Sequence, residues 1–419
     1  MRIGARLSGH AVRGVLVDGT RVLAQASADG VRALGAVLNE LGAMAPGAVQ
    51  SVTLDISDVL LDAVRRPDLE PGGNPVGVLR VLPRPPQHPA VADHPSDLLR
   101  SFVRYRATVA GGHDLFGAPL APLDQAKAVE AARAARELGL GALAVVATGA
   151  VGSPGHESAV AEAVLDAVPE LQVSLSHEIG GIGLLMRETA AVLNAVLLSV
   201  AGQVVDRCER ATRRLGNVPC WFATSDGGRA SAERLRALPV IGLEARAAMT
   251  LRGAAVRNEV KDAVMLIEDG DTYLIGEVRD GLPRVAPDLR GTLGLRLAAP
   301  QAVSTVVSTA SFHANRSRWL HGALGSPVSV IQNIELDLAA VGAASCEPTA
   351  WLDAVVHADS ADELRARQRT MKERVLSMVV AGETPPGTER IIESSAVSLT
   401  YIPSGAYRLR VRAAAGTSP

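Results

Sequence analysis

The chain has 419 residues, with 42 Lys or Arg against 44 Asp or Glu, and its formal net charge at pH 7 is −2. No basic run stands out, which argues against sequence-independent binding of DNA or RNA, because that binding needs clustered positive charge. The N-terminal residues lack the apolar stretch of a secretory signal, and the longest apolar runs, at 142–148 and 190–200, are too short to span a bilayer. We therefore expect a cytoplasmic protein without nucleic-acid or membrane partners, long enough for two lobes with a core each.

The three cysteines, Cys208, Cys220 and Cys346, are far apart in the sequence and odd in number. This pattern fits neither a disulfide framework nor a zinc site. We expect them to be small buried residues, and we expect no metal site.

The first part of the chain predicts short strands at 3–7, 12–17 and 22–25, the last two joined by a hairpin turn at Asp18 and Gly19. A helix is expected at 30–41, a strand at 51–54, a helix beginning near residue 58 and a strand at 76–82. The proline-rich stretch at 82–95 predicts an exposed, extended connection, and a polyproline segment that binds a partner is the alternative.

From residue 124 onward, predicted helices alternate with predicted strands. The helices are expected at 126–138, 157–168 and 184–215, and the strands at 142–147, 173–175, 219–223 and 262–267. Such alternation is typical of parallel strands covered by helices. The C-terminal part predicts a helix at 361–375 and strands at 396–402 and 407–411. The fold class is therefore α/β.

Two turns occur in comparable strand–turn–strand settings, one in each half of the chain. The first is RLSGHAVR, from Arg6 to Arg13, and the second is EDGDTYL, from Glu268 to Leu274. A turn that binds nucleotide phosphates needs glycines for close backbone approach and carboxylates to hold a metal ion. The first turn keeps one glycine, Gly9, and has no acidic residue.

Eight motifs, in order along the chain, resemble those of one family. They are RIGARLSGHAVRGVLVDG at 2–19, VAGGHDLFGAPLAPLD at 109–124, SPGHE at 153–157, SHEIGGIGLLMRETAAVLNA at 176–195, SDGG at 225–228, GLEARAAMTLRGAA at 242–255, IGEVRDGLPR at 275–284 and QNIELDLAAVGAA at 332–344. Together they resemble the hydantoinase A/5-oxoprolinase family, within the actin-like ATPase superfamily that also contains sugar kinases. The resemblance covers nearly the whole chain and fades after about residue 344.

The resemblance implies a two-lobed, actin-like ATPase fold, similar to that of sugar kinases, with a central cleft. The first lobe would comprise residues 1–200 and the second residues 201–419, diverged after about 344. It also implies that members of the family open or activate cyclic amides, such as hydantoins and 5-oxoproline, with ATP and Mg²⁺. The implied partner is a hydantoinase B-like subunit or a second copy of the chain.

The first turn departs from the D-x-G-G-T-x-x-D pattern of that family. Arg6 and Arg13 stand in place of the two acids, Ser8 replaces a glycine, and His10 replaces the threonine, while Gly9 is kept. Without the acids this turn has no ligand for the metal ion that shields the phosphates.

The second turn keeps Glu268, Gly270 and Thr272, but Asp271 stands in place of a glycine. A carboxylate at this position repels phosphate oxygens. Because positions around one cleft are changed together, we expect that ATP and Mg²⁺ are cofactors only if these degenerate turns still bind them.

The first turn leaves two questions open. Arg6 and Arg13 either replace Mg²⁺ as fixed positive charges that hold an anionic ligand, or are ordinary solvated arginines. Ser8 and His10, two residues apart on one strand, either form a nucleophile–base pair or belong to a polar turn.

The other motifs also have structural and functional interpretations. Ser176 is predicted to cap a helix, and Arg187 and Glu188 to form salt bridges at the start of the long helix, with catalysis by the His177 region as the alternative. The turn at 226–228 is either a plain tight turn or faces the cleft. His113 is expected in a solvated loop.

We predict a diverged hydantoinase/oxoprolinase-like protein that has lost ATP-dependent ring opening and serves as a non-catalytic or repurposed subunit. The alternative is an active hydrolase or transferase that acts on a cyclic amide or related carbonyl compound in a rebuilt cleft. The catalytic candidates are Ser8, His10, Asp226 and Glu268. The candidates for binding a cofactor are Arg6, Gly9, Gly227, Gly228, Gly270 and Thr272.

Overall fold

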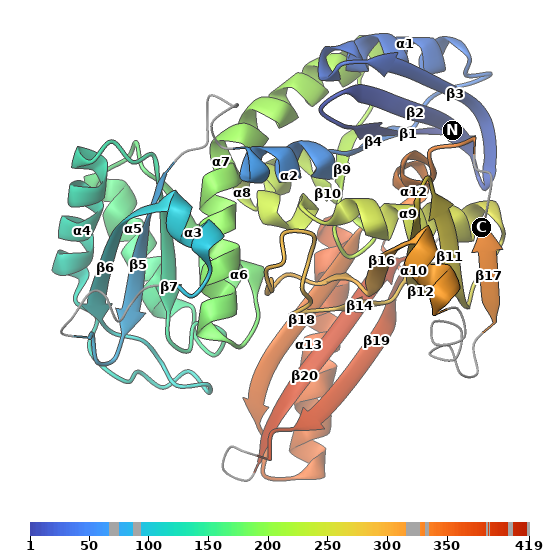
Figure 1. Ribbon diagram of the computed structural model, residues 1–419. Helices are drawn as coiled ribbons and strands as arrows, with labels where there is room; N and C mark the ends of the chain where they lie inside the picture. The colour runs from blue at the N-terminus through green and yellow to red at the C-terminus, as the bar shows by residue number, and fades with distance from the viewer. Residues whose placement is uncertain are drawn as a thin grey trace.

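The computed structural model describes residues 1–66, 75–86, 94–315, 327–331, 335–382, 384, 386–400 and 405–416. Four sheets of three or more strands organise these residues. We call them the N-terminal sheet, the inserted sheet, the second sheet and the C-terminal sheet. In Figure 1 they lie at the top, left, right and bottom, respectively.

The N-terminal sheet has the strand order β10-β9-β4-β1-β2-β3. Its strands are β1 (Arg2–Leu7), β2 (Ala11–Asp18), β3 (Arg21–Asp29), β4 (Ser51–Asp55), β9 (Cys220–Ala223) and β10 (Arg229–Ser231). β1 is antiparallel to β2 and parallel to β4, and β4 is parallel to β9. The five strands predicted in this sheet and the hairpin turn are confirmed, and a 3-10 turn (Val31–Ala33) and α1 (Leu34–Ala43) form the predicted first helix.

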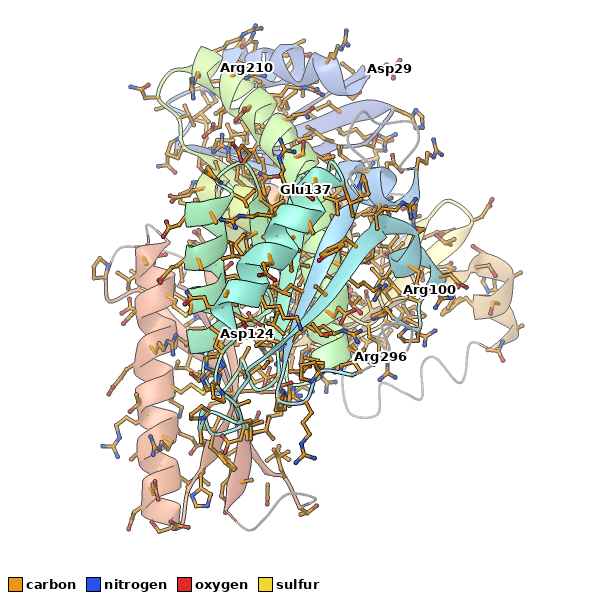
Figure 2. The ribbon with its side chains drawn as sticks, turned by 90° about the vertical axis from the view of Figure 1, so that its left-hand side faces the viewer. Asp29, Arg100, Asp124, Glu137, Arg210 and Arg296 are labelled. Carbon is orange, nitrogen blue, oxygen red and sulfur yellow. The ribbon has the colours of Figure 1, made fainter. Side chains whose placement is uncertain are left out.

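The inserted sheet lies in the chain between β4 and β9 and has the order β6-β5-β7-β8, with all neighbours parallel. Figure 2 views the molecule from this side, with α4 between the labelled Asp124 and Glu137. The elements of this part are α2 (Ser57–Arg65), β5 (Val76–Leu82), α3 (Asp97–Phe102), β6 (Val103–Ala110), α4 (Gln125–Glu137), β7 (Ala142–Ala147), α5 (Gly155–Ala167), β8 (Gln172–Leu175) and α6 (Ser176–Ile179). The alternation of strands and helices is as predicted, and α3 and β6 are additional elements.

Part of the proline-rich segment, residues 87–93, lies outside the described residues. Its last part is not exposed as predicted. His94 is only 5% exposed, and its Nε2 lies 3.0 Å from Oγ1 of Thr189. This end of the segment is therefore anchored in the protein.

The long helix α7 (Leu184–Thr212) joins the N-terminal and inserted sheets in one core and continues into a 3-10 turn (Arg213–Leu215). The sequence predicts that the apolar runs of this region are too short to span a membrane. By length and composition, however, the whole helix could cross one. However, 78% of its most apolar window is buried inside the protein. A helix that is apolar on all sides fits a central core position, and α7 occupies one.

The second sheet repeats the strand pattern of the first. β11 (Ala263–Asp269) is antiparallel to β12 (Thr272–Arg279) and parallel to β17 (Val328–Ile331), as β1 is to β2 and β4. The other elements around it are α8 (Ala232–Ala237), a 3-10 turn (Pro239–Gly242), α9 (Ala245–Arg257), β13 (Leu282–Pro283), β14 (Val285–Ala286), β15 (Gln301–Ala302), β16 (Ser304–Ser308), α10 (Thr309–Ala314) and α12 (Leu338–Ser345). The repeat supports a duplicated architecture.

Close backbone packing joins the two repeats through α12. A Cβ atom on Gly4 of β1 would lie 2.0 Å from the carbonyl oxygen of Ala340 in α12. A Cβ atom on Gly253 of α9 would lie 1.9 Å from the carbonyl oxygen of Leu338. Glycine is therefore required where α12 presses against both repeats.

The C-terminal sheet has the order β18-β20-β19 and is antiparallel. Its strands are β18 (Thr349–His357), β19 (Glu389–Ser398) and β20 (Ala406–Ala415), and α13 (Ala361–Ala381) packs on it. The predicted helix is longer than expected. The strand predicted at 396–402 is wrong in its bounds, because β19 ends at Ser398, and residues 401–402 lie outside the described residues.

The predicted division of the chain at residue 200 falls inside α7, and β9 and β10 complete the N-terminal sheet from beyond it. That division stays a prediction.

Candidate functional site

The first turn connects β1 and β2 and is closed by its own hydrogen bonds. The backbone N–H of Ser8 donates to the carbonyl of Ala11 (2.9 Å), and the hydroxyl of Ser8 accepts from the N–H of Ala11 (3.1 Å). Gly9 and His10 are exposed. The prediction that Ser8 and His10 share one strand is wrong, because β1 ends at Leu7 and β2 begins at Ala11. Ser8 thus serves the turn, and no hydrogen bond joins it to His10 in the described part of the chain.

Arg6 and Arg13, which replace the acids of the family pattern, lie opposite each other in the β1–β2 register. Nε of Arg6 lies 2.9 Å from Oδ2 of Asp337, at the start of α12, and its Nη1 lies 3.5 Å from Oδ2 of Asp58 in α2. Arg13 is exposed, and no residue that the structure describes forms an ion pair with it. One arginine is therefore neutralised by the protein and the other is solvated.

The second turn connects β11 and β12. Gly270 has a φ of 59°, and the hydroxyl of Thr272 donates to the carbonyl of Asp269 (3.0 Å). Asp269 also accepts from Nη2 of Arg246 in α9 (3.1 Å), and Nη1 of the same arginine lies 3.5 Å from Oδ1 of Asp58. The second turn is thus tied to the first repeat through Arg246.

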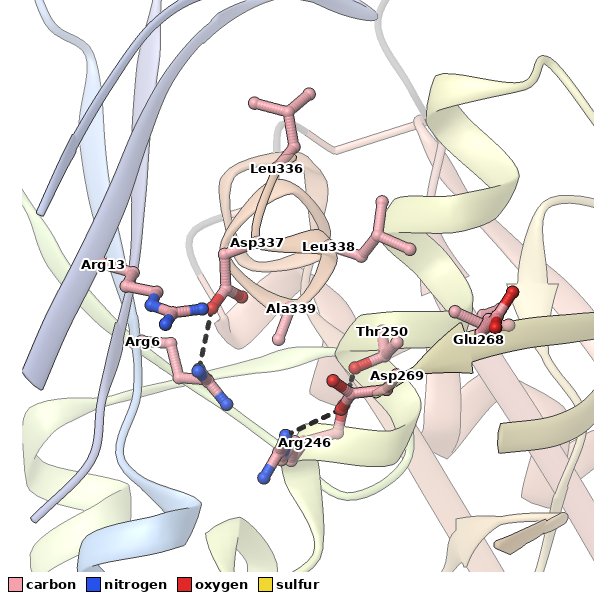
Figure 3. Close-up of a pocket in the computed structure, with 11 residues that line it drawn as sticks. Arg6, Arg13, Arg246, Thr250, Glu268, Asp269, Leu336, Asp337, Leu338 and Ala339 are labelled. Carbon is pink, nitrogen blue, oxygen red and sulfur yellow. Dashed lines mark hydrogen bonds and ion pairs between the residues drawn. The ribbon is translucent and has the colours of Figure 1, made fainter. Parts of the chain in front are cut away.

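Both turns border one cavity of about 110 Å³. Figure 3 shows residues that line it, with the Arg6–Asp337 and Arg246–Asp269 pairs dashed. The lining residues are Arg6, Arg13, Arg246, Thr250, Ile267, Glu268, Asp269, Leu336, Asp337, Leu338 and Ala339. The structure therefore brings Arg6 together with Glu268, as a cleft between two repeats requires.

The ion pairs at this cavity form an alternating chain that links the first repeat to the second part of the protein at two points. In order, its members are Asp337, Arg6, Asp58, Arg246 and Asp269. We call these five residues the ion-pair chain. With Arg13 and Glu268 added, three arginines face four carboxylates, so the surroundings of the cavity have a formal charge of −1.

Asp55, at the end of β4 and next to Arg6 in the sheet register, is a further acid that the sequence interpretation overlooked. It is fully buried, and loss of solvation raises its pKa to about 6, although the N–H of Ser57 donates to its Oδ1 (2.9 Å). Its position directly after the strand predicted at 51–54 could have marked Asp55 as a candidate site residue.

The turn at Asp226 lies elsewhere, packed between β9, β13 and β18. Oδ1 of Asp226 accepts from the hydroxyl of Thr224 (2.6 Å), and Oδ2 accepts from the hydroxyl of Thr349 (2.6 Å). A Cβ atom on Gly227 would lie 2.4 Å from Pro283, and one on Gly228 would lie 1.9 Å from Oγ1 of Thr349. These three residues do not line the cavity, and their contacts are those of a tight structural junction.

In the described residues, no group of three or more His, Cys, Asp or Glu side chains is placed to hold a metal ion. All three cysteines are unpaired, with Cys208 and Cys346 buried and Cys220 partly exposed. Asp58 and Asp337 are already paired with arginines, whereas Asp62 is the acid nearest the first turn, since its Oδ2 would lie 2.9 Å from a Cβ atom on Gly9. The described acids therefore form no ready-made set of ligands for a magnesium ion.

A second polar cluster lies at the carboxyl ends of β5, β7 and β8. Glu188 of α7 receives two hydrogen bonds from Arg80 of β5, at 2.6 and 2.9 Å, which confirms an ion pair at the start of that helix. The predicted helix cap at Ser176 is wrong, because its hydroxyl donates to buried Glu157 instead (2.6 Å). His113 is only 6% exposed, so the expectation of a solvated loop residue is also wrong. Sequence spacing gave no sign of this convergence.

No protein-family model matches the chain, and no curated protein matches it. Two solved structures are similar over its whole length. The nucleotide-free structure of an acetone carboxylase, from work on ATP-dependent acetone carboxylation, has a TM-score of 0.68 at 12% identity, covering 100% of this chain and 88% of that chain. The ATP-dependent caprolactamase from Pseudomonas jessenii has a TM-score of 0.72 at 14% identity, with the same coverage. The predicted two-lobed, actin-like α/β fold is thereby confirmed.

Proposed function

We propose that this chain, which shares the fold of an acetone carboxylase and an ATP-dependent caprolactamase, is a diverged member of the hydantoinase A/5-oxoprolinase family. In this proposal it has lost ATP-dependent opening of cyclic amides and serves as a non-catalytic or repurposed subunit beside a hydantoinase B-like protein. The observation that carries the proposal is the ion-pair chain at the cavity between the two repeats.

Two features of the cavity oppose nucleotide binding: the ion-pair chain and the small volume. A triphosphate would have to displace Asp58 or Asp337 from Arg6, and the carboxylates left behind would repel it. One phosphate charge about 4 Å from a carboxylate costs about 4 kcal/mol at an effective dielectric constant near 20. In addition, the cavity of about 110 Å³ is small, since ligand pockets usually measure roughly 300–1,000 Å³.

The same ion pairs also give the protein a means of holding its repeats together without a nucleotide. Arg6 and Asp58 belong to the first repeat, whereas Arg246, Asp269 and Asp337 belong to the second part of the chain. A subunit with a structural role would gain from such a nucleotide-independent connection.

Nucleotide binding is tested by thermal unfolding with ATP or ADP, with and without Mg²⁺. A site that is saturated at one hundred times its Kd adds about 2.7 kcal/mol of stability. We expect no shift of the unfolding temperature at millimolar nucleotide. A matched variant, Arg6→Asp with Arg13→Asp, restores the acids of the family turn and serves as a comparison. A magnesium-dependent shift in the unaltered protein would contradict the proposal.

The subunit role is tested by co-expression with a hydantoinase B-like protein, followed by size-exclusion chromatography. We expect both chains to elute together in a fixed ratio. Turnover of hydantoin or 5-oxoproline by this chain alone, with ATP, would overturn the proposal.

A further inference from the structure

The carboxyl edge of the inserted sheet is a second place where ligand chemistry is available. Its order, β6-β5-β7-β8, means that the connections after β5 and after β6 lead to opposite sides of β5. Open parallel sheets bind ligands outside the carboxyl ends of their strands, at such a reversal point. The residues that follow β7 and β8 meet here with the start of α5.

Glu157, in the first turn of α5, organises this edge. It is completely buried, and its carboxylate makes four hydrogen-bond contacts. Oε1 accepts from the backbone N–H of Ala147 (2.7 Å) and the hydroxyl of Ser176 (2.6 Å). Oε2 accepts from the backbone N–H of His177 (2.9 Å) and lies 2.7 Å from Nδ1 of the same residue. Because a backbone N–H can only donate a hydrogen bond, each carboxylate oxygen accepts at least one.

A buried cation balances the charge of Glu157. Arg187 is 1% exposed, and its Nη2 donates to the carbonyl of Ala147, the residue whose N–H donates to Glu157. The same arginine approaches the carbonyl of Gly181 at 3.4 Å. The two backbone groups of Ala147 thus link the carboxylate to the guanidinium, which are not in direct contact as an ion pair.

The contact with Glu157 determines which nitrogen of His177 carries the proton. An ionised carboxylate only accepts, so Nδ1 must donate and Nε2 must be the acceptor nitrogen. No residue in the described part of the chain forms a hydrogen bond or ion pair with this Nε2. The side chain is 19% exposed, so a small molecule can reach it. An imidazole held in one orientation by a buried acid is the arrangement that serves as a base in hydrolases.

We propose that Nε2 of His177, oriented by Glu157, is the acceptor group of a second ligand site at this edge. The ligand is a neutral small molecule that donates an N–H or O–H to this nitrogen. We infer a neutral ligand because Glu157 and Arg187, the buried charges next to His177, balance each other. This site is separate from the cavity beside Arg6, and it does not depend on the loss of nucleotide binding.

The first measurement is the tautomer of His177, from nitrogen-15 spectra of histidine-labelled protein. We expect the proton on Nδ1, and the signal is assigned by its absence in His177→Asn. A proton on Nε2 instead would overturn the proposal.

The second measurement is binding of hydantoin, an N–H donor, compared with 1,3-dimethylhydantoin, which has the same ring without an N–H. We expect saturable binding of hydantoin with a shift of the Nε2 signal, and binding at least tenfold weaker for the dimethyl compound. Failure of hydantoin to bind, or equal binding of both compounds, would contradict the assignment.

The variant His177→Asn separates a ligand role from a structural one. Its side-chain amide can still donate to Glu157 in place of Nδ1, so the fold is retained, but the acceptor nitrogen is gone. We expect hydantoin affinity to fall at least tenfold with little change in unfolding temperature. His10→Asn, at an exposed turn, is the matched control and should bind as the unaltered protein does. Equal affinities for both variants would show that His177 only supports the structure.

Discussion

The cavity between the two repeats and the carboxyl edge of the inserted sheet use similar residues with opposite outcomes. At the cavity, Arg6 and Arg246 are each shared between two carboxylates, so the protein itself already balances the charge of both arginines. At the edge, Glu157 takes all its hydrogen bonds from protein groups, yet this leaves Nε2 of His177 as an acceptor without a protein partner. At the cavity, contacts within the protein use the charges that a nucleotide would need. At the edge, contacts within the protein orient His177 and leave its Nε2 available to a ligand.

The largest expected effect comes from removing Glu157 at the carboxyl edge of the inserted sheet. Glu157→Ala leaves Arg187 as a buried charge without its balancing acid and deprives Ala147, Ser176 and His177 of their acceptor. Leaving a buried charge without compensation costs about 3–5 kcal/mol. We expect a loss of this size in urea denaturation followed by circular dichroism. Glu162→Ala, at an exposed position of the same helix, should change stability by less than about 0.5 kcal/mol. Similar losses for both variants would remove the special role of Glu157.

A second effect tests the electrostatics beneath the cavity through pH. Burial raises the pKa of Asp55 to about 6 in the folded state, above its ordinary value of 3.8. Between about pH 4 and pH 6 the folded state therefore holds a proton that the unfolded state has lost, and stability falls as pH rises through this window. The change is at most about 3 kcal/mol. We expect Asp55→Asn to flatten this part of the stability–pH curve and to be the more stable protein at pH 8. An unchanged curve would show that Asp55 is not the group responsible.

A third variant tests how tightly the repeats are joined. Gly4→Ala would place a methyl group 2.0 Å from the carbonyl oxygen of Ala340 and 2.4 Å from the N of Ala344, so α12 would have to move away from β1. Overpacking of this kind costs about 1–3 kcal/mol. Gly202→Ala in α7 meets no atom within 4 Å and should be neutral or stabilising by up to about 1 kcal/mol. We therefore expect the unfolding temperature to fall for Gly4→Ala and to stay unchanged or rise for Gly202→Ala.

The smallest effect concerns the ion-pair chain itself. Asp58→Asn removes its central acid, but Arg6 retains Asp337 and Arg246 retains Asp269. Because these side chains are partly exposed, we expect a loss of about 1 kcal/mol or less at low salt. The difference from the unaltered protein should shrink in high salt, because screening weakens exposed ion pairs. A difference that is independent of salt would point to packing instead of charge.

Local patterns predicted much of the fold. The strand at 142–147 is β7 with the same bounds, since six consecutive apolar residues form a fully buried strand. α12 and α9 gave no comparable signal, because small residues such as Gly253 and Gly342 serve close packing between distant segments. Periodicity cannot show a contact of that kind.

The candidate site was predictable only in part. Arg6 and Glu268 do line one cavity, because corresponding turns of two repeated units face each other. Their ion-pair partner Asp58 comes from a different element, and sequence distance conceals that contact. Asp226 lies in a satisfied junction, whereas Glu157 and His177 meet because parallel strands bring separate loops to one edge. Which strands lie next to each other in a sheet decides these contacts, and the spacing of residues along the sequence does not show it.

The insertion between β4 and β9 has a consequence for how the protein is made. β4 ends at Asp55 and its neighbour β9 begins at Cys220, so the ribosome must add about 165 residues before the pairing can form. At 5–20 residues per second this takes roughly 8 to 30 seconds. During that interval the outer edge of β4 is open to other chains, and open edges are sites of aggregation. A nascent chain stalled before residue 220 should therefore depend on chaperones that cover strand edges.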